Sequence, residues 1–181
     1  MKRELLIDTA TELFYCKGVN EVGINEILKK SGVAKRTLYH HFTSKEDLVI
    51  ATLEKRDKAF CKWLDDRLSM VDEENEVLGS LFSAIEDWLE NRARPLNDFY
   101  GCYFINTSVE LSRQSEKVKQ YCMNHKLRVK DIISDHLAST SQQLINAIYL
   151  LIEGAIVIAF MTGSTEELKS SKLVTQKLLQ D

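Results

Sequence analysis

The stretch INEILKKSGVAKRTLYHHFTSKED, residues 24–47, decides the fold of the N-terminal part of this chain. Its apolar residues recur at helical spacing on both sides of the pair Ser31-Gly32, which predicts two short helices joined by a tight turn. Ser44 followed by Asp47 has capping-box-like spacing and predicts that another helix begins at Lys45. The stretch therefore predicts a helix, a turn, a second helix and then a capped third one.

The second of these helices has a basic and aromatic face. Side chains three or four residues apart share one side of a helix, so Ala34, Leu38 and Phe42 are predicted to form its buried stripe. The outward face then carries Lys35, Arg36, Thr37, Tyr39 and His40. From Ile27 to Lys45 the sequence contains five Lys and Arg and no Asp or Glu. A basic face on a helix after a turn suits the major groove of double-stranded DNA.

Each of these side chains has a role that it could play on DNA. Arg36 can pair bidentately with a guanine edge, and Thr37 can touch a thymine methyl group. Tyr39, His40 and Lys45 suit phosphate oxygens, which position a protein without reading sequence. We therefore expect the DNA-binding residues to be Lys35, Arg36, Thr37, Tyr39, His40 and Lys45. Charge alone favours the alternative, a solvated basic face on a small helical bundle.

Composition predicts an all-α protein. The chain has 181 residues with one Pro and seven Gly, too few turn formers for a β-rich fold. Its net charge is −3, but residues 1–59 carry 11 Lys and Arg against 9 Asp and Glu, whereas the remainder carries 13 against 18. A local basic patch within a mildly acidic chain is compatible with binding nucleic acid.

Helical periodicity predicts about nine helices. They are expected near residues 2–16, 24–31, 34–42, 45–69, 76–93, 102–111, 116–137, 142–161 and 166–179. Gly18 is expected to end the first helix in a left-handed cap, and Pro95 to break the chain after the fifth. We predict two domains, residues 1–52 and 53–181, with the seam inside the fourth helix.

Nothing in the sequence indicates export, a membrane span or a metal site. The N-terminus reads as an amphipathic helix and not as a signal peptide. The apolar residues 144–160 are interrupted by Asn146 and Glu153, so we expect them to fall short of a membrane span. The expected location is therefore the cytoplasm. Four widely spaced cysteines favour reduced thiols over disulfides or zinc ligands, and we expect no cofactor or metal.

The N-terminal motif resembles a known family. Residues 24–48 resemble the helix-turn-helix of the TetR family of bacterial transcriptional regulators (the TetR/AcrR type), with TLYHHFTSKEDL, residues 37–48, as the strongest match. VGINEIL, residues 22–28, is most similar to the NemR-like branch, which includes sensors of electrophiles. Ala34 stands where many members have a capping Ser, a loss of roughly 1 kcal/mol. Gly23 replaces a phosphate-contacting Thr or Ser, so no contact is assigned there.

The resemblance implies a larger C-terminal domain that binds an effector and forms a dimer. The helix near residues 142–161 is apolar almost all round, as expected if it is buried on two sides. We expect its dimer interface to contain Leu144, Ile148, Leu151, Ala155 and Ile158. A homodimer could read a pseudo-palindromic operator with two recognition helices. The alternative is a central core helix in a monomer.

In proteins that this chain resembles, aromatic side chains between the middle helices line a cavity for a small molecule. The expected effector-binding residues are Trp63, Trp88, Tyr100, Cys102, Tyr103, Phe104 and Tyr149. Any one of the aromatic residues could equally be plain core. Cys102 stands at the expected start of a helix, whose dipole favours a thiolate. In the electrophile-sensing branch a cysteine in a Gly-Cys pair at a similar place is the sensor, whereas buried cysteines are commonly inert.

The sequence therefore predicts a non-enzymatic, homodimeric DNA-binding regulator. We expect a repressor that a small molecule or an electrophile releases from its operator. One alternative is a helical adaptor that binds protein through its apolar eighth helix. Another is a small cysteine-dependent enzyme using Cys102 with His125 or His136. No nucleophile motif, metal-ligand pair or phosphate-binding loop supports an enzyme, and the two histidines fit solvated helix faces.

Overall fold

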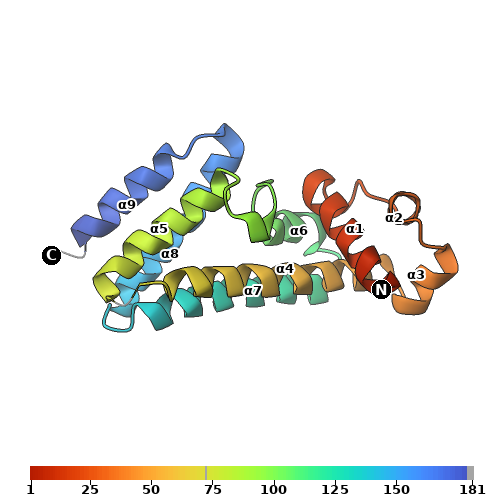
Figure 1. Cartoon of the computed structure of the whole chain (residues 1–181), viewed down its shortest axis with the longest axis horizontal. Coiled ribbons are helices and arrows are strands. Elements are labelled where there is room, and N and C mark those ends of the chain that lie inside the picture. Colours follow the sequence, from red (N-terminus) through yellow and green to blue (C-terminus); the bar gives the residue numbers. More distant parts are fainter. Residues whose placement is uncertain (72, 179–181) are drawn as a thin grey trace. The chain divides into compact units, whose positions relative to one another are not determined.

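The structure is a computed structural model that describes residues 1–71 and 73–178, without the side chains of residues 74 and 75. The described residues form nine α-helices, one short 3-10 helix and no strand (Figure 1), so the predicted all-α fold is confirmed. The helices are α1 (Lys2–Lys17), α2 (Ile24–Ser31), α3 (Lys35–His41), α4 (Lys45–Leu68), α5 (Glu74–Leu89), α6 (Tyr103–Leu111), α7 (Glu116–His136), α8 (Gln142–Thr162) and α9 (Glu166–Leu178), with the 3-10 helix η1 (Arg94–Leu96) before α6.

The chain divides into two compact units. The first contains Met1–Lys58 and Tyr103–His125, and the second contains Ala59–Cys102 and Lys126–Asp181. The boundary between Lys58 and Ala59 lies inside α4, and the division into domains of residues 1–52 and 53–181 stays a prediction. Helix α6 and the first half of α7 belong with the N-terminal helices, although about 45 residues or more separate them in the sequence. The N-terminal helices therefore form one unit with helices that lie far along the chain.

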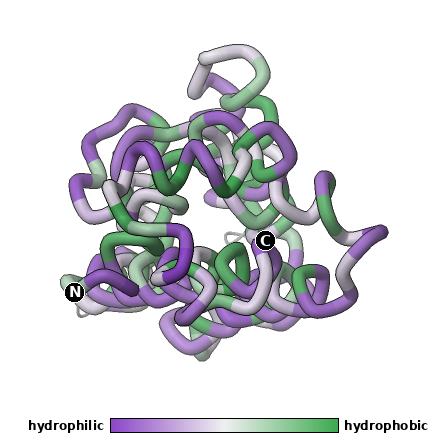
Figure 2. The backbone as a smooth tube through the Cα atoms, turned by 90° about the vertical axis from the view of Figure 1, so that its right-hand side faces the viewer, coloured by the Kyte–Doolittle hydropathy of each residue, from purple (hydrophilic) through white to green (hydrophobic). Residues whose placement is uncertain are grey.

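A hydrophobic core holds the first unit together. Helix α1 packs on α2 and α3, and the side chains of Leu6, Ile27, Leu38 and Leu48 are fully buried. Hydrophobic and hydrophilic residues alternate along the helices, as the hydropathy of the tube in Figure 2 shows. Each of these helices thus turns its apolar stripe inward, and burial of that stripe stabilises the arrangement.

The second unit is built around α8, which packs on α9 and α5. Ser141 caps the helix by accepting the N–H of Leu144, and Gly163 ends it in the left-handed conformation, with φ of 71°. Helix α8 has 21 residues and is apolar enough to cross a membrane by length and composition alone, which the sequence analysis did not expect. The core helix of a soluble protein meets the same test, and Ile145, Ile148 and Ile152 are buried within the chain.

Several local predictions were wrong. Gly18 does end α1, but with φ of 91° and ψ of 152° instead of a left-handed helical cap. Helix α5 ends at Leu89, before Pro95, and Asn91 makes the turn with φ of 61°. Pro95 lies inside η1, where proline is tolerated because the first turn of a helix needs no N–H donor. Cys16, near the end of α1, is exposed.

Candidate nucleic-acid interface

Helices α2 and α3 are joined by a tight turn whose geometry requires glycine. Gly32 has φ of 67°, a left-handed conformation, and its N–H donates to the carbonyl of Leu28 at 2.9 Å. Leu38 is completely buried, and Val33 and Phe42 on either side of α3 are also buried. Ala34, predicted to share this stripe, is exposed. Its place is taken by Val33, because the chain enters α3 in an extended conformation at residue 34.

The face of α3 opposite Leu38 is open. Lys35, Arg36, Tyr39 and His40 are exposed, and Thr37 is half-buried. Within the described part of the chain, Lys35 and Arg36 take part in no ion pair. Their charges therefore remain available to a partner. Five of the six predicted DNA-binding residues lie together on this short helix.

The sixth predicted residue, Lys45, is placed differently. Its ammonium donates to the carbonyl of Val19 at 2.6 Å and lies 5.8 Å from the centre of the Phe14 ring. Burial lowers the pKa of Lys45, while the nearby Glu110 carboxylate opposes that effect. Lys45 thus points into the first unit and connects the start of α4 to the turn after α1.

The start of α4 is capped close to the way that the sequence predicted. The Asp47 N–H donates to the Ser44 hydroxyl at 3.0 Å. The Asp47 carboxylate accepts the Thr43 N–H at 3.1 Å and also the Thr43 hydroxyl. The hydroxyl of Thr43 is the main reason that the pKa of Asp47 lies below its usual value. The cap fixes where α3 ends and α4 begins.

Glu110, at the end of α6, holds the turn between α1 and α2, which comprises residues 18–23. Its carboxylate accepts the Val19 N–H at 3.0 Å and the Asn20 N–H at 2.6 Å. Gly18 adjoins this contact, and a Cβ atom there would lie 3.1 Å from a Glu110 oxygen. Glu110 is not among the residues predicted from the sequence, because nothing local to residue 110 indicates a partner 91 residues earlier.

The predicted effector residues fall into both units. Trp63 and Trp88 are buried and pack on Phe60 in an aromatic cluster of the second unit. Tyr103 belongs to the first unit, where its hydroxyl lies 2.7 Å from that of Thr52. Phe104, also in the first unit, stacks on His125. Tyr100 is exposed.

Cys102 and Tyr149 share a half-buried polar cluster in the second unit. The Cys102 thiol is buried and lies near the Lys126 ammonium. Lys126 also donates to Glu153 at 2.6 Å. Burial alone lowers the pKa of Lys126, but Cys102 and Glu153 outweigh it and raise the pKa. Burial and the Glu153 carboxylate raise the pKa of Tyr149.

A groove of about 420 Å³ lies between α5 and α9. Phe82 and Leu168 form part of its apolar lining, and Glu86, Lys169 and Lys172 its charged part. The seven predicted effector residues are absent from the described lining of this groove. The groove therefore does not explain the effector site that the resemblance implied.

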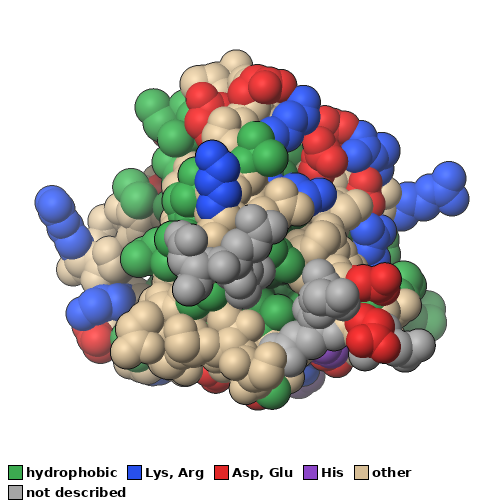
Figure 3. Space-filling model, turned by 90° about the vertical axis from the view of Figure 1, so that its left-hand side faces the viewer, with side chains coloured by type: hydrophobic (Ala, Val, Ile, Leu, Met, Phe, Trp, Pro, Cys, Tyr) green, Lys and Arg blue, Asp and Glu red, His purple; other side chains and the backbone are tan. Residues whose placement is uncertain are grey.

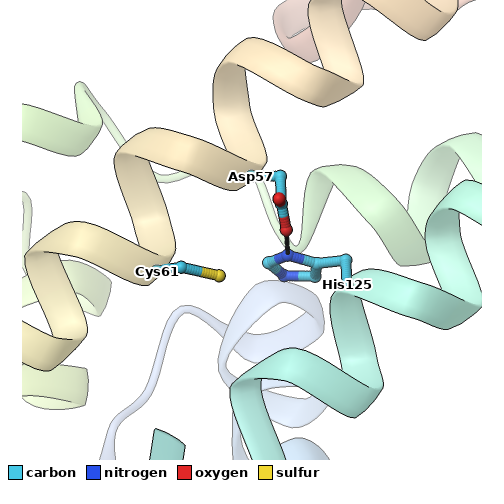
Figure 4. A group of neighbouring side chains, drawn as sticks. All are labelled: Asp57, Cys61 and His125. Atoms are coloured by element: carbon cyan, nitrogen blue, oxygen red, sulfur yellow. Dashed lines mark hydrogen bonds and ion pairs between the residues drawn. The ribbon is translucent and has the colours of Figure 1, made fainter.

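His125 is buried, although the sequence analysis placed it on a solvated helix face. Its Nδ1 lies 2.8 Å from a carboxylate oxygen of Asp57 on α4 (Figure 4). Figure 4 also draws Cys61, one helical turn after Asp57. His125 is thus engaged in packing between helices of the first unit, and this pairing weakens the suggestion that it serves Cys102 as a catalytic base.

Helix α8 exposes a different apolar face from the predicted dimer stripe. Of that stripe, Ile148 and Ala155 are buried in the chain's own core, Leu144 and Leu151 are half-buried, and Ile158 is exposed. The exposed apolar residues of α8 are Leu150, Val157, Ile158, Phe160 and Met161. Figure 3 shows hydrophobic side chains at the surface among charged ones on one side of the molecule.

Comparisons with known proteins agree with this geometry. A family model described as "Bacterial regulatory proteins, tetR family" matches residues 6–52. An uncharacterised HTH-type transcriptional regulator of Lactococcus lactis is 24% identical over 176 residues, covering 93% of this chain and 88% of the relative. The HTH-type transcriptional regulator LmrA of Bacillus subtilis is 22% identical, covering 92% of this chain and 90% of the relative.

Solved structures share the fold. A TetR-family regulator of Streptomyces coelicolor has a TM-score of 0.87 at 23% identity, covering 99% of this chain and 95% of its own. The reduced form of NemR from Escherichia coli has a TM-score of 0.83 at 24% identity, covering 98% of this chain and 96% of its own. The helix-turn-helix of α2 and α3 and the matched family model identify residues 6–52 as a DNA-binding domain of the TetR-family type, and the full-length relatives named above are transcriptional regulators.

Proposed function

We propose that this regulator is a homodimeric repressor that binds a pseudo-palindromic operator and leaves it when a chemical signal acts on the second unit. The observation that carries the proposal is the open face of α3. There Lys35, Arg36, Tyr39 and His40 are exposed, while Leu38 on the opposite side is fully buried and fixes the helix. A fixed helix with an open basic face can enter the major groove as a rigid body.

The roles on DNA follow from chemistry and exposure. Arg36 has the bidentate fork that matches the O6 and N7 acceptors of guanine, and Thr37 can contact a thymine methyl group. Lys35, Tyr39 and His40 can bind phosphate oxygens. We do not propose Lys45 as a DNA-binding residue, because its ammonium donates to the Val19 carbonyl. Its contribution to DNA binding is to hold the turn after α1.

The exposed apolar face of α8 supports a second copy of the chain as the partner. Leu150, Gly154, Val157 and Met161 recur at spacings of four, three and four residues and are all exposed, so they form one stripe. Ile158 borders it, and the absence of a side chain on Gly154 permits close helix approach. This stripe replaces Ile148 and Ala155 in the proposed dimer interface. Two copies related by a two-fold axis would match an operator with two half-sites.

The signal site that we propose lies at Cys102. Its thiol adjoins Lys126, which Glu153 holds at 2.6 Å. A cysteine sulfur is the side-chain atom that electrophiles modify most readily. Release of DNA would follow if modification of Cys102 favours a second global conformation with lower affinity for the operator.

The experiment that tests DNA binding begins with selection of bound genomic fragments to find an operator. Operator affinity is then measured against salt concentration for the wild type, Arg36→Ala and Arg94→Ala. Arg94 is exposed in η1 of the second unit and provides a matched control. We expect Arg36→Ala to lose roughly 1–3 kcal/mol per half-site and to relax discrimination at one base position. Arg94→Ala should bind like the wild type.

The outcomes separate the candidate functions. Equal binding to all fragments, or equal affinity of Arg36→Ala and the wild type, contradicts the proposal and favours a helical adaptor. Repression itself is tested with a reporter gene behind the selected operator. Expression should rise when the regulator is deleted. A fall in expression would instead indicate an activator.

A further inference from the structure

The contact between Glu110 and the α1–α2 turn assigns a function to α6. Both oxygens of the carboxylate are used, one on the Val19 N–H at 3.0 Å and the other on the Asn20 N–H at 2.6 Å. Two consecutive backbone N–H groups that point at one anion form a nest, a recurrent way of binding negative charge. Here the anion comes from the chain itself.

Three further contacts support this arrangement. The Lys45 ammonium donates to the carbonyl of Val19 at 2.6 Å, from the opposite side of the same residue. Glu110 acts on Lys45 electrostatically, since the carboxylate opposes the effect of burial on the pKa of that lysine. Gly18 has φ of 91° and leaves room for the carboxylate, because a Cβ atom there would lie 3.1 Å from it. We call Glu110, Val19, Asn20 and Lys45 the turn clamp.

The turn clamp lies where it can set the position of the DNA-reading helices. The turn leads directly into α2, and its Val19 and Val22 side chains are buried. Helix α2 packs on α1, with ion pairs from Lys17 to Glu26 at 2.6 Å and from Lys30 to Glu12 at 2.5 Å. Only the tight turn of residues 32–34 separates α3 from α2. A shift of residues 19 and 20 would therefore move the face that carries Arg36.

We propose that Glu110 is a positioning residue for operator binding, through which α6 holds the helix-turn-helix in its DNA-reading position. Glu110 itself touches no DNA in this proposal. The inference rests on the proposed function for its DNA readout, and it extends that function by naming the connection. Helix α6 begins at Tyr103, directly after the proposed signal residue Cys102. The helix that follows the signal residue thus ends at the turn clamp.

The substitution that tests the clamp is Glu110→Gln, which keeps the size and shape of the side chain. A glutamine has a single acceptor oxygen, and its NH2 group would face a second N–H donor. Glu54→Gln is the matched control, since within the described part of the chain the ion pair of Glu54 is the exposed one with Lys58, four residues later on the same helix.

Two readouts are measured on the full chain: hydrogen exchange of the Val19 and Asn20 amides, and affinity for the selected operator. In Glu110→Gln we expect both amides to exchange about tenfold faster or more, and the operator affinity to fall about tenfold. The Glu54→Gln control should stay within about twofold of the wild type in operator affinity.

Each result decides the inference. Unchanged amide exchange in Glu110→Gln shows that the carboxylate does not hold the turn and overturns it. Faster exchange with unchanged operator affinity also overturns it, because the turn then moves without moving the reading helix. If the wild type binds no operator, the proposed function fails, while the exchange rates still decide whether Glu110 holds the turn.

Discussion

A single charge on the exposed face of α8 should convert the dimer into monomers. The perturbation is Val157→Asp, in the middle of the stripe. Val157 is 39% exposed in the isolated chain, so an aspartate can be solvated there and the monomer should fold. In a dimer related by a two-fold axis, two carboxylates would meet an apolar interface and lose their hydration.

The magnitude follows from the exposed apolar surface. The exposed fractions are 68% for Leu150, 39% for Val157, 38% for Ile158 and 77% for Met161 on α8, and 61% for Leu173 and 47% for Val174 on α9. Together they equal roughly three fully exposed side chains, whose burial would contribute roughly 5–10 kcal/mol per protomer. Association itself costs about 4–15 kcal/mol. The net free energy of dimerisation is therefore small enough that one buried charge in each protomer makes dimerisation unfavourable.

Burial of an uncompensated carboxylate costs several kcal/mol, so the dissociation constant should rise at least about a thousandfold, or ~4 kcal/mol. Sedimentation velocity over a range of protein concentrations measures this constant, and circular dichroism checks the fold. Val109→Asp is the matched control, because Val109 is 79% exposed on α6, in the other unit. A Val157→Asp protein that dimerises like the wild type would refute the reasoning, as would equal dissociation of both variants.

Three further predictions concern the signal, the core and the start of α4. N-ethylmaleimide should release the wild type from its operator and leave Cys102→Ser bound; equal release in both proteins would remove Cys102 from the mechanism. Tyr103→Phe should lower the free energy of unfolding by only about 1 kcal/mol in urea titrations, because the Thr52 hydroxyl still donates to a backbone carbonyl at 2.6 Å; a loss several times larger would contradict this. The Thr43 hydroxyl lowers the pKa of Asp47 below the ordinary 3.8, so the cap should stabilise the fold above about pH 4 and lose that effect as the pH falls through the lowered pKa. The stability difference between the wild type and Asp47→Asn should shrink in that acidic range, and a constant difference down to pH 2 would count against the cap.

Sequence patterns predicted the local structure well wherever a neighbour within a few residues controls it. The Ser31-Gly32 turn is an example, because a left-handed residue after a helix favours glycine. The capping contact from Ser44 to the Asp47 N–H is another. The end of α5 was missed, since Asn91 rather than Pro95 makes the turn. Both residues fit a loop, so composition alone could not choose between them.

The orientation of α8 could not be predicted from the sequence pattern. Both of its long faces are apolar, so periodicity could not tell which one meets α5 and α9 and which one meets a partner. The structure buries Ile148 and Ala155 and exposes Leu150 and Val157. That choice depends on the shapes of the other helices in the unit, which single-helix periodicity does not contain.

The sequence by itself determined the helices, the turn and the basic face of residues 35–40, because these depend on contacts within one or two helical turns. Only the tertiary structure decided which distant side chains meet. It turned Lys45 inward to Val19 and brought Glu110 to a turn 90 residues before it. It also paired His125 with Asp57, 68 residues earlier. A carboxylate, an ammonium or an imidazole has no periodic signature for its partner, and only the packing of the helices brings such groups within hydrogen-bonding distance.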